Sequence, residues 1–408
     1  MADTGIKFTA SEILDDLWWI GVVALGVSLF ATPVVRFIAY RARIVDRPDH
    51  LLKPHHRPVA YLGGLAMCAG LLVGLGAFVA GMPDAGAKWT QLRADLGQGR
   101  LDRLFHNDLW QLMAIGLACL LITLVGLLDD LRNLKPSQKI GGQLLAGAVL
   151  LAGGVGQQMA QVAFSLGSYQ PPTWVMLPLS TAMAVITIIF ASNATNLLDG
   201  LDGLCGGVTG IIAIGFLALA VWLAQWGQHP GTDELRVGLC LAMAGAVLGF
   251  LPYNIPPASI FMGDAGSMLL GFFVATSMIL FCEQGAARWL LAAWVVFALP
   301  VLDTALAVVR RLVMRQSIFA GDRSHLYDQL VDRGMTVKQV VVLFYLLAAL
   351  AAVIGVTAAI YLRFRYAIWI YLGVLAAIWI VFYVKGMITP APREPQPADS
   401  ADSSGAIR

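Results

Sequence analysis

The sequence predicts an all-α, polytopic integral membrane protein with about eleven transmembrane helices. Of its 408 residues, 58% are hydrophobic and only 13% are charged, whereas soluble domains carry roughly 25% charged residues. The apolar residues also gather in runs of about 20, the length of helix that crosses a bilayer. These observations exclude a soluble globular core, and we expect residues 1–389 to form a single membrane domain.

The apolar runs give the expected helices in chain order. They lie near residues 17–40, 60–82, 109–128, 139–158, 173–192, 205–226, 237–252, 266–283, 289–309, 339–362 and 366–385. The seventh and eighth runs are the least regular, because Pro252, Pro256 and Pro257 lie between them. Residues 390–408 are rich in Pro, Ser, Ala and Asp, a composition that predicts a disordered cytosolic tail.

Loop charges orient the predicted bundle. An odd number of spans places the two termini on opposite sides, and Lys and Arg gather in cytosolic loops. With the N-terminus outside, the loops 41–59, 129–139 and 310–338 are cytosolic, and they hold most of the basic residues. Every candidate motif described below then faces the cytosol. The basic residues form no stripe, so no nucleic-acid partner is expected.

The most informative motif is NATNLLDGLDGL at residues 193–204. A carboxylate in or beside bilayer hydrocarbon costs several kcal/mol, so Asp199 and Asp202 indicate a bound cation or phosphate. If the segment is helical, Asn196 shares a face with both acids. Such oxygen donors suit Mg²⁺, with Mn²⁺ as an alternative. The plainer interpretation is that Asn193 or Asn196 caps a helix end.

A second acidic motif, GLLDDLRNLKPSQK, ends the third run at residues 126–139. Adjacent helical residues point about 100° apart, so only one of Asp129 and Asp130 can face a site squarely. With Lys139 nearby, the pair could supply a general base and anion contacts. Solvated loop acids, or a cap for the next helix, are the alternatives.

A third motif, PYNIPPASIFMGDAGS, spans residues 252–267. Its glycines allow backbone N–H groups to approach a bound anion. Asp264 could reach a metal ion, and Phe261 could stack on a planar base. The alternative is a plain turn with an apolar anchor.

Two basic loops complete the set of candidate segments. Residues 45–64 contain Lys53 and His55, and residues 310–330 contain Arg323 and His325. We expect phosphate, sugar or substrate-entry contacts from them. Basic residues immediately beside a span more often fix topology. The histidines have neither HExxH spacing nor a cysteine partner, so no zinc site is indicated.

Together these segments resemble the polyprenyl-phosphate N-acetylhexosamine-1-phosphate transferase superfamily over about residues 45–329. The resemblance rests on the DD pair at 129–130, NxxNxxDGxDG at 193–203 and MGDxGS at 262–267. It implies the following roles: magnesium ligands Asn196 and Asp264; acids that deprotonate the lipid phosphate, Asp129 and Asp130; acids near the nucleotide, Asp199 and Asp202; and uracil and ribose contacts, Asn254 and Phe261. Further substrate contacts are expected from Lys53, His55, Lys139, Asn193, Arg323 and His325.

Two segments depart from the pattern of this superfamily. Residues 52–55 keep Lys53 and His55 of the usual RKxH motif, and the late loop keeps His325 alone of three histidines. The late loop is similar to the branch that uses other UDP-N-acetylated hexoses, so the donor sugar stays open.

The resemblance implies an enzyme of the bacterial inner membrane with its active site facing the cytosol. It would transfer an N-acetylhexosamine 1-phosphate, in first place GlcNAc 1-phosphate, from a UDP-sugar to undecaprenyl phosphate in the lipid bilayer, releasing UMP. Mg²⁺ is the expected cofactor and a homodimer the candidate oligomer. The alternative from another class is an ion-coupled transporter, because transporter sites also use intramembrane carboxylates.

Overall fold

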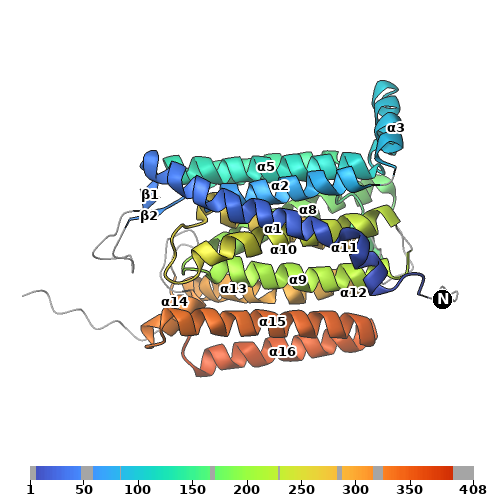
Figure 1. Ribbon diagram of the computed structural model, residues 1–408. Helices are drawn as coiled ribbons and strands as arrows, with labels where there is room; N and C mark the ends of the chain where they lie inside the picture. The colour runs from blue at the N-terminus through green and yellow to red at the C-terminus, as the bar shows by residue number, and fades with distance from the viewer. Residues whose placement is uncertain are drawn as a thin grey trace, which may run out of the picture.

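A computed structural model shows long helices running side by side through most of the molecule (Figure 1). The structure describes residues 6–46, 58–82, 84–165, 171–227, 230–282, 287–315 and 325–388. The first elements are α1 (Ala10–Arg41), β1 (Val45–Asp46), β2 (Val59–Ala60), α2 (Gly63–Gly81), α3 (Ala85–Gly97), α4 (Leu101–Leu104), α5 (Asp108–Arg132), α6 (Pro136–Ala152), α7 (Met159–Phe164) and α8 (Thr173–Leu197). The others are α9 (Leu204–Ala224), α10 (Pro230–Asn254), α11 (Gly263–Cys282), α12 (Ala287–Val296), α13 (Ala298–Val313), α14 (Leu326–Asp332), α15 (Val337–Tyr361) and α16 (Phe364–Val384).

The all-α polytopic fold is confirmed, although the count of eleven spans is not. Within the described residues, nine helices are long and apolar enough to cross a membrane, and α12 with α13 makes a tenth if this pair, bent by 70°, counts as one span. The remaining expected span is α6, which has 17 residues. At 1.5 Å per residue it rises only about 25 Å, less than the ~30 Å hydrocarbon core.

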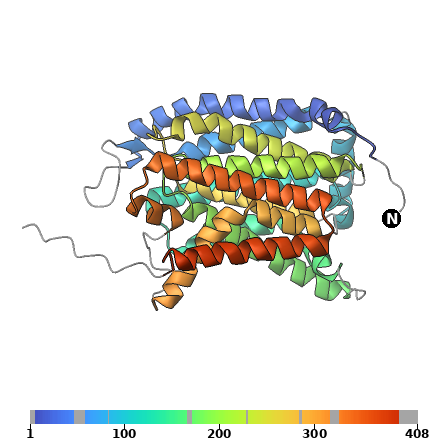
Figure 2. The same cartoon turned by 90° about the horizontal axis from the view of Figure 1, so that it is seen from below.

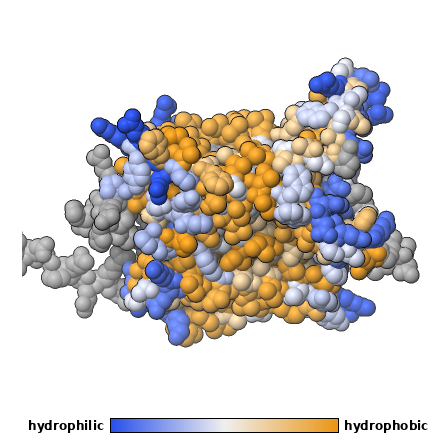
Figure 3. Space-filling model, in the orientation of Figure 1, coloured by the Kyte–Doolittle hydropathy of each residue, from blue (hydrophilic) through white to orange (hydrophobic). Residues whose placement is uncertain are grey.

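The bundle is organised around α11. Every residue of α11 except Asp264 is buried, whereas only Ala367 and Phe382 are buried in α16, at the edge of the bundle. Figure 3 shows a broad hydrophobic band between more hydrophilic ends. In Figure 2 the red helix α16 lies on the outside and the orange α13 crosses the bundle obliquely. An apolar belt of this kind is the surface that lipid tails contact.

Helix boundaries differ from the expected ones where the acidic motifs lie. The expected loop at 129–139 is shorter, because α5 continues through Asp129 and Asp130 to Arg132. α8 likewise continues through Asn196 and ends at Leu197. Asp264 falls in the first turn of α11 rather than in a loop. Residues 198–203, called the acidic loop below, are not helical, so Asp199 and Asp202 do not extend the helix face of Asn196.

The ends of α5 and α8 and the start of α11 lie together at one end of the bundle. β1 and β2 pair antiparallel there, and Ala60 of β2 bridges to Ile260 in the connection between α10 and α11. The backbone N–H of Gly63 then donates to the carbonyl of Phe261 at 2.9 Å. α1 begins at the opposite end from that at which α16 finishes (Figure 1). The two termini of the helical bundle therefore lie at opposite ends.

Candidate active site

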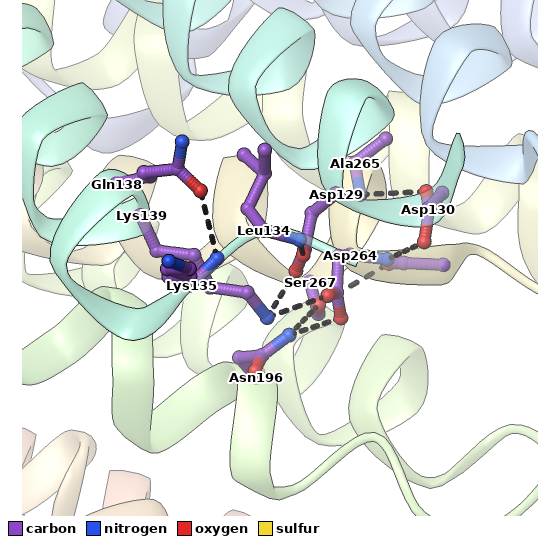
Figure 4. A network of polar contacts seen from close by, with 11 residues as sticks. Asp129, Asp130, Leu134, Lys135, Gln138, Lys139, Asn196, Asp264, Ala265 and Ser267 are labelled. Carbon is purple, nitrogen blue, oxygen red and sulfur yellow. Dashed lines mark hydrogen bonds and ion pairs between the residues drawn. The ribbon is translucent and has the colours of Figure 1, made fainter. Parts of the chain in front are cut away.

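Four helices bring charged and amide side chains together at this end of the bundle. The last turn of α5 supplies Asp129 and Asp130, α6 supplies Lys139, the last turn of α8 supplies Asn196, and the first turn of α11 supplies Asp264 (Figure 4). The sequence predicted all five, from three separate motifs. The structure places them in one polar network.

Lys139 joins two carboxylates that come from different helices. Its Nζ lies 2.9 Å from Oδ2 of Asp264 and also forms an ion pair with Oδ2 of Asp129. The other oxygen of Asp129 accepts from the backbone N–H of Leu134 at 2.6 Å. Asp129 is almost fully buried, whereas Lys139 and Asp264 stay partly accessible. The lysine therefore offsets negative charge at a site that a solute can still reach.

Asp130 holds the start of α11. Its two carboxylate oxygens accept the backbone N–H groups of Asp264, at 2.7 Å, and Ala265, at 3.1 Å. These donors belong to the positively polarised end of the helix. Gly263 precedes them with φ +68°, and a Cβ there would lie 2.5 Å from Oδ2 of Asp130. Asp130 therefore positions Asp264, a role that the sequence did not predict.

Asn196 links α8 to α11 through its side-chain amide. Its Nδ2 donates to Oδ1 of Asp264 at 2.6 Å and to Oγ of Ser267 at 2.9 Å. The Ser267 hydroxyl in turn donates to the carbonyl of Gly263 at 3.2 Å. Ser267 was not predicted as a site residue, although it ends the MGDAGS motif. Both residues implied as magnesium ligands, Asn196 and Asp264, are thus in direct contact.

The acidic loop carries two further acids with different surroundings. Oδ2 of Asp202 accepts the backbone N–H of Ala258 at 2.8 Å. For the carboxyl of Asp199, which is half-buried, the described part of the chain provides no hydrogen bond or ion pair. Burial raises the pKa of Asp199 well above its usual range, and neighbouring carboxylates, chiefly Asp264, add to this shift. Asp199 is therefore the acid best suited to respond to an added cation.

Three residues predicted to bind substrate make contacts within the protein. Asn193 donates to Oε1 of Gln143 at 3.1 Å, which joins α8 to α6. Asn254 is buried, and it accepts from the N–H of Gly203 and donates to the carbonyl of Ile260, each at 3.1 Å. Phe261 is half-buried and packs edge-on against Tyr61. Their contacts with substrate stay predictions.

The late basic loop is described only in part. His325 is buried, and its Nδ1 lies 2.8 Å from Oδ2 of Asp303 on α13. Lys53, His55 and Arg323 lie outside the described residues, as does the tail at 390–408. Their predicted roles stay predictions.

The sequence did not predict that two tyrosines would contact the acidic loop. Tyr327 donates to the carbonyl of Leu197 at 3.0 Å, and Tyr345 donates to that of Gly203 at 2.7 Å. Tyr327 stands where the late loop of the superfamily has a histidine, but no local motif indicates that Tyr327 or Tyr345 contacts the acidic loop, because α14 and α15 are far along the chain from it. The available signal was indirect: glycines at 200 and 207 leave room for a close neighbour.

The donor set suits Mg²⁺ in partnership with substrate. Within the part of the chain that the structure describes, no group of three or more His, Cys, Asp or Glu side chains could hold a metal by itself. Mg²⁺ often binds through one or two carboxylates together with waters and substrate phosphates. Asp264 and Asp129 already converge on the cation of Lys139, and the amide oxygen of Asn196 is a further ligand of the right type. The residues therefore fit a magnesium site that phosphates complete.

Comparison with known proteins finds one family model and several transferases that resemble this chain. The family model for glycosyl transferase family 4 matches residues 112–282, which contain the whole polar network. A decaprenyl-phosphate N-acetylglucosaminephosphotransferase of Mycobacterium leprae is 31% identical over 94% of this chain and 92% of its own length.

Two further relatives carry similar names. The "probable undecaprenyl-phosphate N-acetylglucosaminyl 1-phosphate transferase" of Bacillus subtilis is 28% identical over 84% of this chain and 85% of its own length. An undecaprenyl-phosphate alpha-N-acetylglucosaminyl 1-phosphate transferase of Escherichia coli K12 is 27% identical over 82% of both chains. The likeness thus extends well beyond the polar network.

Proposed function

The chain belongs to glycosyl transferase family 4, and on that premise we propose that it transfers N-acetylglucosamine 1-phosphate from UDP-N-acetylglucosamine to a polyprenyl phosphate. The observation that carries the proposal is the network of Asp129, Lys139, Asn196 and Asp264 at one end of an apolar bundle. A lipid acceptor can reach such a place through the bilayer while a nucleotide donor reaches it from water.

The reaction is a single displacement at phosphorus. An oxygen of the lipid phosphate attacks the β-phosphorus of the donor and forms a new P–O bond. The bond from that phosphorus to the oxygen bridging to the α-phosphorus breaks, and UMP leaves with the electron pair. We favour this direct route, because a phosphate oxygen is already nucleophilic and an enzyme-bound intermediate would add a step.

Each side chain of the network has a task in this displacement. Asp129 takes the proton from the acceptor phosphate, and the adjacent Lys139 is paired with its carboxylate. Lys139 also offsets the repulsion between two phosphate-bearing substrates. Asp130 keeps Asp264 in place through the start of α11.

The proposed reaction would use a divalent cation held by the protein. Asp264 and the amide oxygen of Asn196 would hold Mg²⁺, with substrate phosphates and waters as its other ligands. When bound, Mg²⁺ would stabilise the charge that develops on the leaving UMP. Asp199 and Asp202, on the acidic loop, are assigned to the nucleotide side of the site.

The cellular setting follows from the same arrangement. We assign the protein to the bacterial inner membrane, with undecaprenyl phosphate as acceptor and the polar network facing the cytosol, because most loop Lys and Arg lie on that side. The transporter alternative receives no support. Transporter sites lie near the bilayer midplane, whereas Asp129 and Asp264 lie at the ends of α5 and α11.

One assay tests the proposal. Purified protein in detergent is given UDP-GlcNAc, undecaprenyl phosphate and Mg²⁺, and UMP release is measured together with the glycolipid. We expect both products in equal amounts, no UMP without the lipid phosphate, and loss of turnover with EDTA or in Asp264→Ala. UMP release without acceptor, or full turnover in EDTA, would contradict the mechanism. A panel of UDP-sugars then identifies the preferred donor.

A further inference from the structure

We propose that Tyr327 and Tyr345 are positioning residues that clamp the two ends of the acidic loop. This inference rests on the proposed function, because the loop they fix carries two of the acids of the transfer site. Both tyrosines come from the C-terminal part of the chain, beyond the last of the motifs that supply the polar network. They make α14 and α15 part of the catalytic apparatus without placing either side chain on the substrate.

The first end of the acidic loop is held by Tyr327. Its hydroxyl donates to the carbonyl of Leu197 at 3.0 Å. Leu197 is the last residue of α8, and the final carbonyls of a helix lack partners within that helix. The tyrosine is 5% exposed, so its hydrogen bond is shielded from water. The bond therefore fixes the point at which the chain leaves α8 and enters the loop.

The ring of Tyr327 is itself held on both sides. It stacks on His325 with a centroid distance of 5.5 Å and an interplanar angle of 6°, and it meets Phe344 edge-on at 6.5 Å. His325 is held by Asp303, which is fully buried and also accepts the N–H of Leu326 at 2.6 Å. A continuous set of contacts thus runs from α13 through α14 to the end of α8.

The second end of the loop is held by Tyr345. Its hydroxyl donates to the carbonyl of Gly203 at 2.7 Å. The N–H of Gly203 donates to Oδ1 of Asn254 at 3.1 Å, so both backbone polar groups of this residue are bound. Gly203 has φ +74°, a conformation that favours glycine. The chain is therefore fixed just before α9 begins.

Two glycines make room for the tyrosines. A Cβ at Gly200 would overlap the hydroxyl and ring of Tyr327, and a Cβ at Gly207 would overlap those of Tyr345. Gly200, directly beside Asp199, therefore has a protein side chain as its close neighbour. Asp199 lies between the two fixed ends, so the clamp sets the backbone from which its carboxyl projects.

The test removes each hydroxyl without removing the ring. Tyr327→Phe and Tyr345→Phe are compared with Tyr371→Phe, which loses a similar hydrogen bond, 3.3 Å to the carbonyl of Gly355, between α15 and α16. We expect each clamp variant to lower kcat about 10-fold, the effect of about 1.4 kcal/mol, with KM for UDP-GlcNAc nearly unchanged. The Tyr371 variant should keep the wild-type kcat.

A second measurement follows the loop without any reaction. Hydrogen–deuterium exchange of the peptide containing residues 198–203 should become faster in both clamp variants and not in Tyr371→Phe. Equal exchange in all three variants, or equal kcat values, would overturn the clamp. If the wild-type protein fails to transfer sugar but the exchange pattern holds, the proposed function fails while the structural clamp stands.

A double-mutant cycle checks the contact at Gly200. Gly200→Ala should lower kcat at least as much as Tyr327→Phe, because the added methyl group displaces the ring. In a Tyr327→Ala background the same methyl group meets empty space, so adding it should cost little more. If instead the two losses multiply, Gly200 is not in functional contact with Tyr327, and the positioning role is refuted.

Discussion

Gly263→Ala tests how tightly Asp130 and the start of α11 define the site. Gly263 has φ +68°, and an added Cβ would lie 2.5 and 2.8 Å from the two oxygens of Asp130. The left-handed conformation alone costs an alanine roughly 1–2 kcal/mol. Displacing the carboxylate also weakens its hydrogen bonds to the N–H groups of Asp264 and Ala265. A hydrogen bond to a charged group contributes about 1.5–3 kcal/mol, so the total loss should be about 2.5–5 kcal/mol.

Gly334→Ala is the matched control for this substitution. Gly334 has φ +95°, and nothing lies within 4 Å of the position of its Cβ. It therefore incurs the conformational penalty without the collision. Thermal unfolding in detergent should show a clearly larger fall in midpoint for Gly263→Ala. UMP release should fall by two or more powers of ten in that variant alone, because Asp264 moves with the start of the helix. Equal losses in the two variants would refute a positioning role for Asp130.

The remaining predictions concern Lys139, the acidic loop and the membrane topology. Lys139→Met should abolish transfer because it leaves Asp129 and Asp264 without their ammonium partner, whereas Lys135→Met, at an exposed position, should stay near wild-type turnover. Burial raises the pKa of Asp199, so ionisation of this acid lowers the stability of the folded protein. Asp199→Asn should therefore unfold at a higher temperature than wild type at about pH 8. The difference should vanish at about pH 3, where both side chains are neutral. Activity of Asp199→Asn should nonetheless be low at every pH. A thiol introduced by Ser137→Cys should be labelled only from the cytosol and one from Gln98→Cys only from outside; the reverse pattern would contradict the orientation.

The site contains one lysine and several acids whose contacts differ. Lys139 bridges Asp129 and Asp264, so one ammonium offsets part of the negative charge of two carboxylates before substrate arrives. Both oxygens of Asp130 accept backbone N–H groups of α11. Asp199 alone among these acids has no partner in the described part of the chain. We expect the arrival of a metal and two phosphates to change the surroundings of Asp199 most.

The sequence by itself determined the class of the protein and most members of the site. Hydropathy depends on a local run of residues, so ten of the expected spans correspond to helices or a helix pair that meet the criteria for a membrane span. The three motifs also supplied Asp129, Lys139, Asn196 and Asp264 before any geometry was known. These motifs can be recognised from the sequence because, within each one, the carboxylates and amides suited to binding phosphate or metal lie only a few residues apart.

Only the tertiary structure decided which group each residue contacts. Lys139 and Asp264 are 125 positions apart, and Tyr327 is 130 positions from the carbonyl that it binds. No local pattern encodes such pairs, because they depend on which helices pack together and where each helix ends. Asp129 and Asp130 differ for the same reason. They are neighbours in sequence at the end of α5, but Asp129 pairs with Lys139 of α6, whereas Asp130 accepts a backbone N–H from the first turn of α11.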